Sequence, residues 1–381
     1  MMNNNNTAAA FETYTLVFHL RGLAALEVAM GTAVTQSALN ALQAGLPALK
    51  AAVLQDETQV LPISGLPRGM WGVRYQSPAR AADAQAEKQA AIHFAATQLG
   101  MELAKQVFGS ATASFARLHV ALLPGHPERE TLLAQVEKAL PPEDAAAERA
   151  LQQVLAHHAV RTFLQPVVGF PDALLLGFEA LARGLEGSPV ERADQLFGVA
   201  ARMGRSRELE IACAWQALQW LERLPTHQWL SINLSALSFT DEKLRRALAR
   251  PGIVVELTEH LPLNNAHSLL PLIAELRAGG ARLALDDTGC GFADLQAIET
   301  LRPDFIKLCI TVIRSVKRDP AQVLRELEAT IAHLRALGVG ILAEGVESED
   351  EARLLAALDI DYAQGWLYGK PQPAACFLVA D

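Results

Sequence analysis

RLALDDTGCG, at residues 282–291, is the segment around which the rest of the chain can be interpreted. Its first half is a short apolar run that is typical of a buried parallel strand, and this run ends in Asp286 and Asp287. The glycines that follow let the backbone turn sharply. Two adjacent carboxylates at a strand end form a place for cations. A lone Asp-Asp pair is usually an ordinary polar loop cap, so the interpretation depends on whether other strands end in the same way.

From residue 161 onward, short apolar segments alternate regularly with amphipathic helical patterns. Eight of these segments are candidate strands, and they read FLQPVV, GFEALAR, LSINLS, IVVELTE, RLALDD, FIKLC, GILAEGV and YAQGWLYG. Eight strands with helical crossovers over roughly 220 residues are typical of a barrel whose functional groups lie at the C-terminal strand ends. The predicted fold class is therefore α/β, with a TIM-type (β/α)8 barrel.

Polar side chains follow or interrupt these apolar runs. A barrel would gather eight of them around one mouth, namely Glu179, Asn233, Glu256, Asp286, Asp287, Lys307, Glu344 and Gln364. A single acidic residue at a strand end is more often a helix cap or a solvated loop residue. The shared position on so many strands is what indicates a site.

Oxygen donors dominate this set, which suits Mg²⁺ or Mn²⁺ far better than zinc, and no HExxH or clustered cysteine site competes. The carboxylates are numerous enough for two cations. Two cations about 3.5–4 Å apart would activate a water and stabilise the leaving oxygen in an in-line attack on a phosphodiester. Lys307 would either add positive charge beside the attacking water or form a salt bridge across the barrel mouth, and the sequence favours neither interpretation.

The N-terminal part has a different organisation. Residues 1–10 are rich in Asn and Ala and are predicted to be disordered. The strand-like segments TYTLVFHL, WGVRY and LHVALL then alternate with helical patterns at residues 23–52, 81–103 and 128–140. This alternation predicts a smaller α/β domain over residues 11–142. Residues 143–157 are predicted to be a helical connector, so the barrel would take up residues 158–381.

Length and composition bound the class of protein. A length of 381 residues suggests about two domains, and no stretch approaches the ~18–20 uninterrupted apolar residues that span a bilayer. The chain begins without a secretory pattern and its four cysteines form no CxxC pair, so we expect a cytoplasmic protein. A formal net charge of -9 argues against non-specific binding along nucleic acid, although a local cationic or metal site could hold a small phosphorylated ligand.

The motifs of the C-terminal part also resemble those of EAL domains, the cyclic di-GMP phosphodiesterases. GFEALARG at residues 177–184 is similar to the ExLxR signature, with LQPVV just ahead of it. Further matches follow in family order, namely SINLS, VELTE, LDDTGCG, PDFIKL, AEGVES and QGWLYGKPQP. The resemblance covers about residues 150–381, and this many ordered motifs argue against chance similarity.

This resemblance implies metal-dependent hydrolysis of cyclic di-GMP to linear pGpG, with Mg²⁺ or Mn²⁺ as the cofactor. Ca²⁺ is expected to be inhibitory, supporting binding but little turnover, because it is larger and tolerates irregular geometry. It implies that two metals are held by Glu179, Asn233, Glu256, Asp286 and Asp287. It also implies a homodimer formed through the EAL domain.

The resemblance assigns the other residues of the mouth as well. Lys307 and Glu344 would orient or deprotonate the hydrolytic water, and Glu259 would hold the loop after the Asp pair in place. The residues implied in substrate binding are Arg183, Gln165 and Gln364. Gln364 would in addition support the metal ligands.

One departure from the family pattern lies in the loop after Asp286. The family usually has Asp-Phe-Gly-Thr-Gly there, whereas residues 287–291 of this chain read DTGCG. The missing aromatic at Thr288 is expected to loosen the loop and to lower basal hydrolysis, so Thr288→Phe should raise the rate and Glu259→Ala should nearly eliminate it. Cys290 is best interpreted as a small residue filling a tight turn, because nothing basic adjoins it to lower its pKa.

The N-terminal part resembles a degenerate GGDEF domain, the usual partner of EAL. LVFHLRGLAALEVAMGTAVTQSAL follows that family's opening strand and helix, yet Arg21 stands where the family has a metal-binding Asp. The segment PRGMWGVRY contains no acidic residue, so we expect no synthesis of cyclic di-GMP from GTP. We expect instead a regulatory role with a signalling protein partner, although an unrelated sensory α/β domain remains an alternative.

Two other function classes make different demands on the barrel. A non-catalytic cyclic di-GMP receptor acting through protein partners needs only the pocket, and the intact set of acidic residues disfavours it. A glycosidase using Glu256 and Glu344 would leave the Asp pair and Lys307 without roles.

Overall fold

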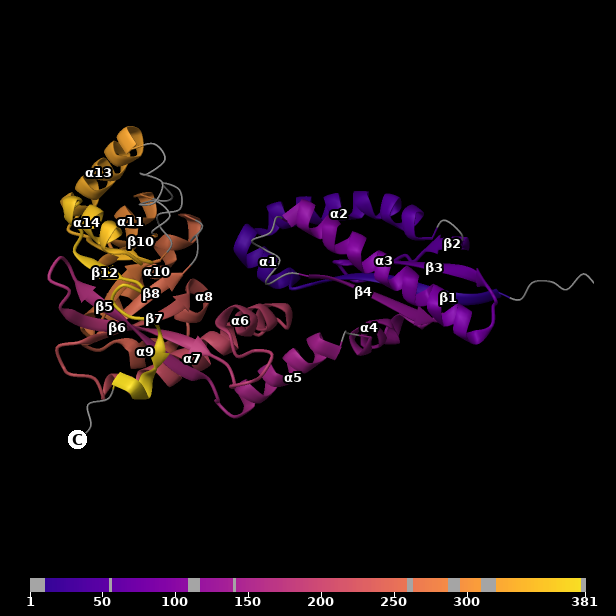
Figure 1. Cartoon of the computed structure of the whole chain (residues 1–381), viewed down its shortest axis with the longest axis horizontal. Helices are drawn as coiled ribbons and strands as arrows, with labels where there is room; N and C mark the ends of the chain where they lie inside the picture. The colour runs from indigo at the N-terminus through magenta and orange to yellow at the C-terminus, as the bar shows by residue number, and fades with distance from the viewer. Residues whose placement is uncertain are drawn as a thin grey trace, which may run out of the picture. The chain divides into compact units, whose positions relative to one another are not determined.

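The computed structural model describes residues 11–54, 57–108, 117–139, 142–258, 263–286, 295–309 and 320–377. The chain forms two compact units (Figure 1). Unit 1 comprises Met1–Gln152, Ser188–Val190 and Asp194–Ser206. Unit 2 comprises Gln153–Gly187, Glu191–Ala193 and Arg207–Asp381. No helix in the described ranges is long and apolar enough to cross a membrane.

Unit 1 is built on an antiparallel four-stranded sheet in the order β2-β3-β1-β4. Its strands are β1 (Phe11–Arg21), β2 (Thr58–Pro62), β3 (Met70–Pro78) and β4 (Arg117–Pro124). Its helices are α1 (Leu23–Met30), α2 (Thr32–Val53), α3 (Ala82–Phe108), α4 (Arg129–Lys138) and α5 (Pro142–Ala156). Because side chains alternate along a strand, Leu16 and Phe18 of β1 pack against α2 and α3, whereas Val17 packs against α4. The smaller α/β domain predicted from the sequence is therefore present.

Two details of unit 1 differ from the prediction. The helix expected over residues 23–52 is divided at Gly31, whose φ of 79° lies in the left-handed region that glycine adopts readily and that a helix does not. Strand β2 was not predicted. All five of its residues are exposed, so it lacks the apolar alternation by which a strand is found in a sequence.

Helix α5, the predicted connector, is anchored at one end of this sheet. Arg21 and Arg117 are Cα partners on β1 and β4, and α5 presents Asp144 and Glu148 one turn apart. The guanidinium of Arg21 donates to Glu148, and Nη1 of Arg117 lies 2.9 Å from Oδ1 of Asp144. Arg21, at the position where the resemblance places a metal-binding Asp, is thus held in an ion pair.

Two histidines lie side by side on the same face of the sheet. His19 of β1 and His119 of β4 are Cα partners, and neither ring nitrogen of the buried His119 has a hydrogen-bond partner in the described part of the chain. Burial, and then the charge of Arg21, lower the pKa of each histidine to about 4. Asp144 opposes this shift at His119 only in part. Both rings are therefore neutral in the folded protein at pH 7.

We expect unit 1 to lose stability as the pH falls from 7 to 5. Unfolded histidine has a pKa of about 6.5, so below this value the unfolded chain binds more protons than the folded one. The free energy of unfolding is therefore at its full value above about pH 6.5 and decreases as the pH falls toward 4. The decrease amounts to roughly 2 kcal/mol per histidine at pH 5. Denaturant unfolding at the two pH values should show a smaller loss for His119→Leu than for the wild type or for the exposed-site control His126→Gln. Equal losses in all three proteins would contradict this explanation.

Unit 2 is a closed barrel. Its strands are β5 (Arg161–Gly169), β6 (Leu175–Arg183), β7 (Trp229–Ser235), β8 (Ile253–Thr258), β9 (Arg282–Leu285), β10 (Phe305–Cys309), β11 (Gly340–Glu344) and β12 (Tyr362–Gln364), and β12 pairs with β5 to close the ring. The short β13 (Gln372–Pro373) adds to β5. Its helices are α7 (Ser206–Leu221), α8 (Ala236–Phe239), α9 (Glu242–Leu248), α10 (Leu263–Ala278), α11 (Leu295–Leu301), α13 (Pro320–Ala336) and α14 (Glu349–Ala357), with a final turn η2 (Ala374–Phe377). Helix α6 (Ala193–Arg202) falls almost wholly within unit 1. The predicted TIM-type barrel is confirmed, and all eight predicted strands are found.

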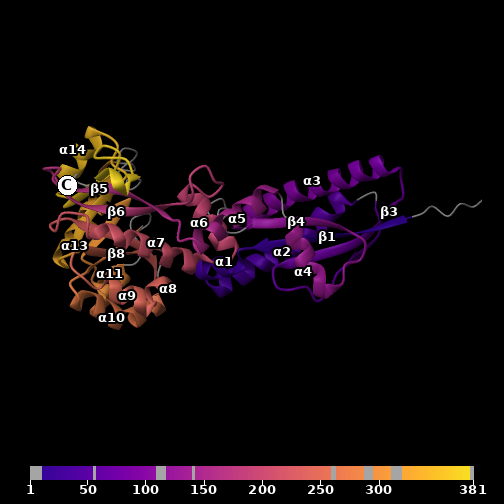
Figure 2. The ribbon, with the colours of Figure 1, turned by 90° about the horizontal axis from the view of Figure 1, so that it is seen from below.

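One strand departs from a fully parallel barrel. β5 runs antiparallel to both of its ring neighbours, β6 and β12. β5 and β6 lie side by side in Figure 2. The segment between β5 and β6 spans only residues 170–174, which is enough for a hairpin but too short for the crossover that parallel neighbours require. The remaining neighbouring strands, from β6 round to β12, pair in parallel.

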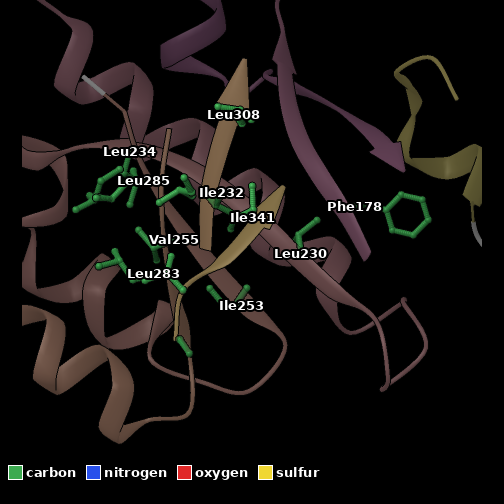
Figure 3. Close-up of a cluster of buried hydrophobic side chains, with 14 of the residues drawn as sticks. Phe178, Leu230, Ile232, Leu234, Ile253, Val255, Leu283, Leu285, Leu308 and Ile341 are labelled. Atoms are coloured by element: carbon green, nitrogen blue, oxygen red, sulfur yellow. The ribbon is translucent and has the colours of Figure 1, made fainter. Parts of the chain in front are cut away.

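Alternation along the strands separates the core from the barrel interior. Figure 3 shows the buried side chains of one such cluster, among them Ile232 and Leu234 of β7 and Val255 of β8. Asn233 lies between Ile232 and Leu234 in sequence, and Glu256 lies between the buried Val255 and Leu257. Both therefore point to the other side of the sheet, into the barrel. Packing of the apolar residues thus fixes the direction of the polar ones.

Candidate active site

Lys307 lies at the centre of the polar mouth predicted from the sequence. Its side chain is 1% exposed, and among the residues that the structure describes its Nζ contacts four carboxylates from four other strands or strand ends. The distances are 2.6 Å to Glu344, 2.8 Å to Glu256, 3.4 Å to Glu179 and 3.7 Å to Asp286. The structure therefore brings together residues that are up to 165 positions apart in the chain (344 − 179).

Glu179 is held by amides on both of its oxygens. Asn233 Nδ2 donates to Oε1 at 2.7 Å, and Gln364 Nε2 donates to Oε2 at 2.6 Å. Gln364 Nε2 also lies 3.1 Å from Oε1 of Gln165, whose own amide donates to the carbonyl of Gly369. These bonds connect β5, β6, β7 and β12, and they leave the orientation of the Glu179 carboxylate little freedom.

The charges of the cluster act strongly on each other. Burial would lower the pKa of Lys307, but the surrounding carboxylates outweigh it and hold this pKa well above its usual value. Burial would raise the pKa of Glu179, but Lys307 and the hydrogen bonds from Gln364 and Asn233 hold it below its usual value. Glu179 and Lys307 are therefore an ionised pair at neutral pH.

Glu256 and Glu344 behave differently. Burial raises the pKa of Glu256 to about 7 against the attraction of Lys307, and repulsion from Glu179 and Asp286 adds to the rise. Burial likewise raises the pKa of Glu344 to about 8. One ammonium is too little positive charge for four carboxylates, so the cluster as a whole favours additional cations.

The end of β7 is fixed by a residue that the sequence did not single out. Glu210 of α7 accepts hydrogen bonds at Oε2 from the backbone N of Ser235 (2.9 Å) and from its hydroxyl (2.6 Å). The Ser235 hydroxyl in turn accepts from Ser238 N and caps α8. Because Asn233 precedes this anchor by two residues, Glu210 helps to set the direction of the amide that holds Glu179. The capping pattern of Ser235 is visible in the sequence, but its partner 25 residues earlier is not.

Arg183 lies at the end of β6, away from the contacts around Lys307 that are described above. Its guanidinium stands 5.2 Å from the centre of the Phe163 ring, and its Nη1 donates to the carbonyl of Ala182. Its side chain shares the face of β6 with Glu179, four residues earlier. This position is compatible with contact to a ligand that enters the barrel mouth.

Several predicted residues lie outside the described residues, namely Glu259, Asp287, Thr288 and Cys290. The described residues contain no group of three His, Cys, Asp or Glu side chains arranged to hold a metal ion directly. The donor chemistry nevertheless fits Mg²⁺ or Mn²⁺, since Glu179, Glu256 and Asp286 offer carboxylate oxygens and Asn233 an amide oxygen at one end of the barrel.

The closed barrel, the buried lysine and the acidic residues around it define the class of the protein as an α/β barrel with an acidic centre. The family model described as "EAL domain" matches residues 148–371, so the chain belongs to the EAL domain family. The N-terminal unit lies almost entirely outside this match, and its resemblance to a GGDEF domain stays a prediction.

Curated relatives match a similar share of the chain. The probable cyclic di-GMP phosphodiesterase PdeG of Escherichia coli (strain K12) is 29% identical over 248 residues, which cover 60% of this chain and 48% of that protein. The cyclic di-GMP phosphodiesterase PdeF of the same organism is 28% identical over 237 residues, covering 58% of this chain and 31% of that protein. The chain thus spans half or less of the length of these relatives.

Solved structures agree with the fold. The PaMucR phosphodiesterase in complex with c-di-GMP is 27% identical, with a TM-score of 0.54, and the match covers 61% of this chain and 99% of that chain. An EAL domain protein from Listeria monocytogenes EGD-e is 21% identical with a TM-score of 0.54, covering 62% of this chain and 96% of that chain, and it supports the fold alone.

Proposed function

We propose that the barrel hydrolyses cyclic di-GMP to linear pGpG with the help of two divalent cations. The observation that carries this proposal is the convergence of Lys307 with Glu179, Glu256, Asp286 and Glu344 at one end of a family-matched barrel. Relatives named as cyclic di-GMP phosphodiesterases, and a solved relative with this dinucleotide bound, support the choice of substrate.

The cation ligands in this proposal are Glu179, Asn233, Glu256 and Asp286, together with Asp287 beyond the described residues. When bound, Mg²⁺ or Mn²⁺ would supply water activation and stabilisation of the leaving oxygen. Gln364 and Asn233 orient the carboxylate of Glu179 by donating to its two oxygens, and Gln165 positions Gln364. These amides keep the donor set in place before the substrate arrives.

Lys307 and Glu344 are proposed to act on the hydrolytic water. Their 2.6 Å contact fixes the Glu344 carboxylate, which at 23% exposure is the most open of the four acidic groups around Lys307. Glu344 is therefore the most accessible of these four groups to entering water, and in its ionised form it would accept the water proton. Arg183 is proposed to bind a phosphate or a guanine of the substrate.

Incubation of the purified chain with cyclic di-GMP and Mg²⁺ or Mn²⁺, followed by nucleotide chromatography, tests this function. We expect pGpG to appear with either cation, and Ca²⁺ to support binding but little turnover, because it is larger and tolerates irregular geometry. Binding without turnover in any cation would identify a receptor in place of an enzyme.

We further propose that the N-terminal unit regulates and does not synthesise. Arg21 pairs with Glu148, and the segment around Trp71 offers no acidic side chain as a metal ligand. We expect no cyclic di-GMP from GTP and Mg²⁺ with a full-length Glu179→Ala variant, in which breakdown of any product would be blocked. Detection of cyclic di-GMP in that reaction would refute this prediction.

Replacement of Glu210 by Gln is expected to lower kcat about 10-fold or more with a smaller change in KM. A second-layer partner that orients a ligand typically contributes this much. The amide keeps the shape but loses the negative charge that accepts from both the N and Oγ of Ser235. Glu222→Gln, at an exposed ion pair of unit 2, is the matched control. Unchanged kinetics in Glu210→Gln would show that β7 does not depend on this anchor.

A further inference from the structure

A hollow separate from the barrel lies in unit 1, between the beginning of α3 and the sheet. Its volume is about 410 Å³, and it is lined by residues that include Tyr14 of β1, Leu122 and Pro124 of β4, and Gln85, Ala86 and Gln89 of α3. This volume falls within the range of about 300–1,000 Å³ that small-molecule sites occupy. α3 runs along β4 in this unit (Figure 1).

Two buried glutamines of α3 stand beside the hollow, at positions where packing alone would favour apolar residues. The buried stripe of α3 consists of Gln85, Gln89, Ile92, Ala96 and Gly100. Its last three members pack against the sheet in the usual way, but its first two are glutamines that are only 4% and 8% exposed. Burial of a primary amide is unfavourable unless its hydrogen bonds are made. The two glutamines therefore call for an explanation other than packing.

Each of these amides is only half satisfied. Gln85 Nε2 donates to the hydroxyl of Tyr14 at 3.2 Å, and Gln89 Oε1 accepts from the hydroxyl of Tyr75 at 2.5 Å. Gln85 Oε1 and Gln89 Nε2 have no hydrogen-bond partner in the described part of the chain. Residues four apart on a helix lie on the same face. One acceptor and one donor on the same face of α3 thus have unused hydrogen-bonding capacity.

The surroundings favour an uncharged, flat ligand. The rings of Tyr14 and Tyr75 stack with their centres 5.7 Å apart, which holds both hydroxyls in place, and Leu122 adds an apolar wall. The carboxylate of Glu12 stands at the rim and accepts from Tyr14. Glu57, which forms an ion pair with Lys88, also places negative charge close to both tyrosines. An anionic ligand would meet this negative charge, whereas a neutral one would not.

We propose that this hollow is a binding site for a small, neutral, planar molecule that carries a hydrogen-bond donor beside an acceptor on one edge, as nucleobases and primary carboxamides do. The donor of the ligand would bind Gln85 Oε1, and its acceptor would bind Gln89 Nε2. The terminal torsion of glutamine is soft, so both amides can turn these buried atoms toward the hollow when a ligand enters, and bonds to the ligand would then replace the bonds to the hydroxyls of Tyr14 and Tyr75. The site is independent of hydrolysis in the barrel.

Saturation-transfer NMR of the full chain with adenosine and with nicotinamide tests this proposal, and the two arms distinguish a nucleobase from a carboxamide. We expect saturation transfer to at least one probe. If adenosine binds, N6,N6-dimethyladenosine, which keeps the ring but lacks the donor, should bind about tenfold or more weakly. If nicotinamide binds, the negatively charged nicotinate should be weakened similarly.

Two variants in which an alanine of α3 is replaced by leucine locate the bound probe. Ala86→Leu extends a side chain into the hollow, and Ala90→Leu makes the same change one turn later, at an exposed position that does not line it. We expect affinity to fall about tenfold or more in Ala86→Leu and to be unchanged in Ala90→Leu. The absence of saturation transfer to both probes, binding that persists in Ala86→Leu, or an equal loss in the two variants would each overturn the proposal.

Discussion

Glu179→Ala is expected to lower the rate of cyclic di-GMP hydrolysis on the order of 1,000-fold or more. This carboxylate is the most constrained group of the site, since Asn233 and Gln364 donate to its two oxygens and Lys307 lies 3.4 Å away. Its loss removes an anionic cation ligand and at the same time leaves two amides without their acceptor. Both effects act on the geometry of the same centre, so no neighbouring group can replace it.

Kinetics of purified variants measure this effect. Glu179→Gln should be almost as impaired, because it keeps the volume but brings a third amide to a place where two amides already donate. Glu222→Ala, which removes an exposed carboxylate of unit 2, should retain wild-type rates. If circular dichroism shows that Glu179→Ala is folded and the variant still turns over at a rate near that of the wild type, the assignment of this active site is wrong.

The barrel could be predicted from the sequence because each strand carries its own apolar run and each functional residue interrupts or follows that run. In β7, Ile232 and Leu234 must face the helices, and this fixes Asn233 on the inside. The direction of β5 was not predicted, since an apolar run has the same periodicity in either direction. Only the short segment at residues 170–174 distinguishes a hairpin from a crossover there.

The contacts that orient the site could not be predicted in the same way. Gln165 meets Gln364 from 199 residues away, and Glu210 meets Ser235 from another layer of the fold. Neither pair follows from a local pattern, because their contact depends on closure of the barrel and on the packing of α7. For Lys307, the sequence left a salt bridge and a catalytic role equally open. The structure shows the salt bridges, while the catalytic role rests on the proposed hydrolysis.

Lys307→Met is expected to destabilise unit 2 strongly in the absence of divalent cations. In the described part of the chain the ammonium is the shared partner of four carboxylates, and two of these, Glu179 and Glu256, are less than 10% exposed. Removal of one partner from a buried ion cluster typically costs about 3–5 kcal/mol. Methionine fills a similar volume, so the loss is mainly one of charge. Lys243→Met, at an exposed lysine of the same unit, should change stability little.

Divalent cations should reverse part of this loss, and this response tests the cation site without reference to turnover. If Glu179, Glu256 and Asp286 bind Mg²⁺ or Mn²⁺, removal of the competing ammonium raises the affinity, and a ligand that binds only the folded state stabilises it in proportion to RT ln(1 + [L]/Kd). Calorimetric unfolding in EDTA and in increasing Mg²⁺ should therefore show a larger gain for Lys307→Met than for the wild type, while hydrolysis stays low in both conditions. A variant as stable as the wild type in EDTA would mean that protonation alone relieves the mutual repulsion of these carboxylates. A variant that gains no stability from Mg²⁺ or Mn²⁺ would mean that they do not form a cation site.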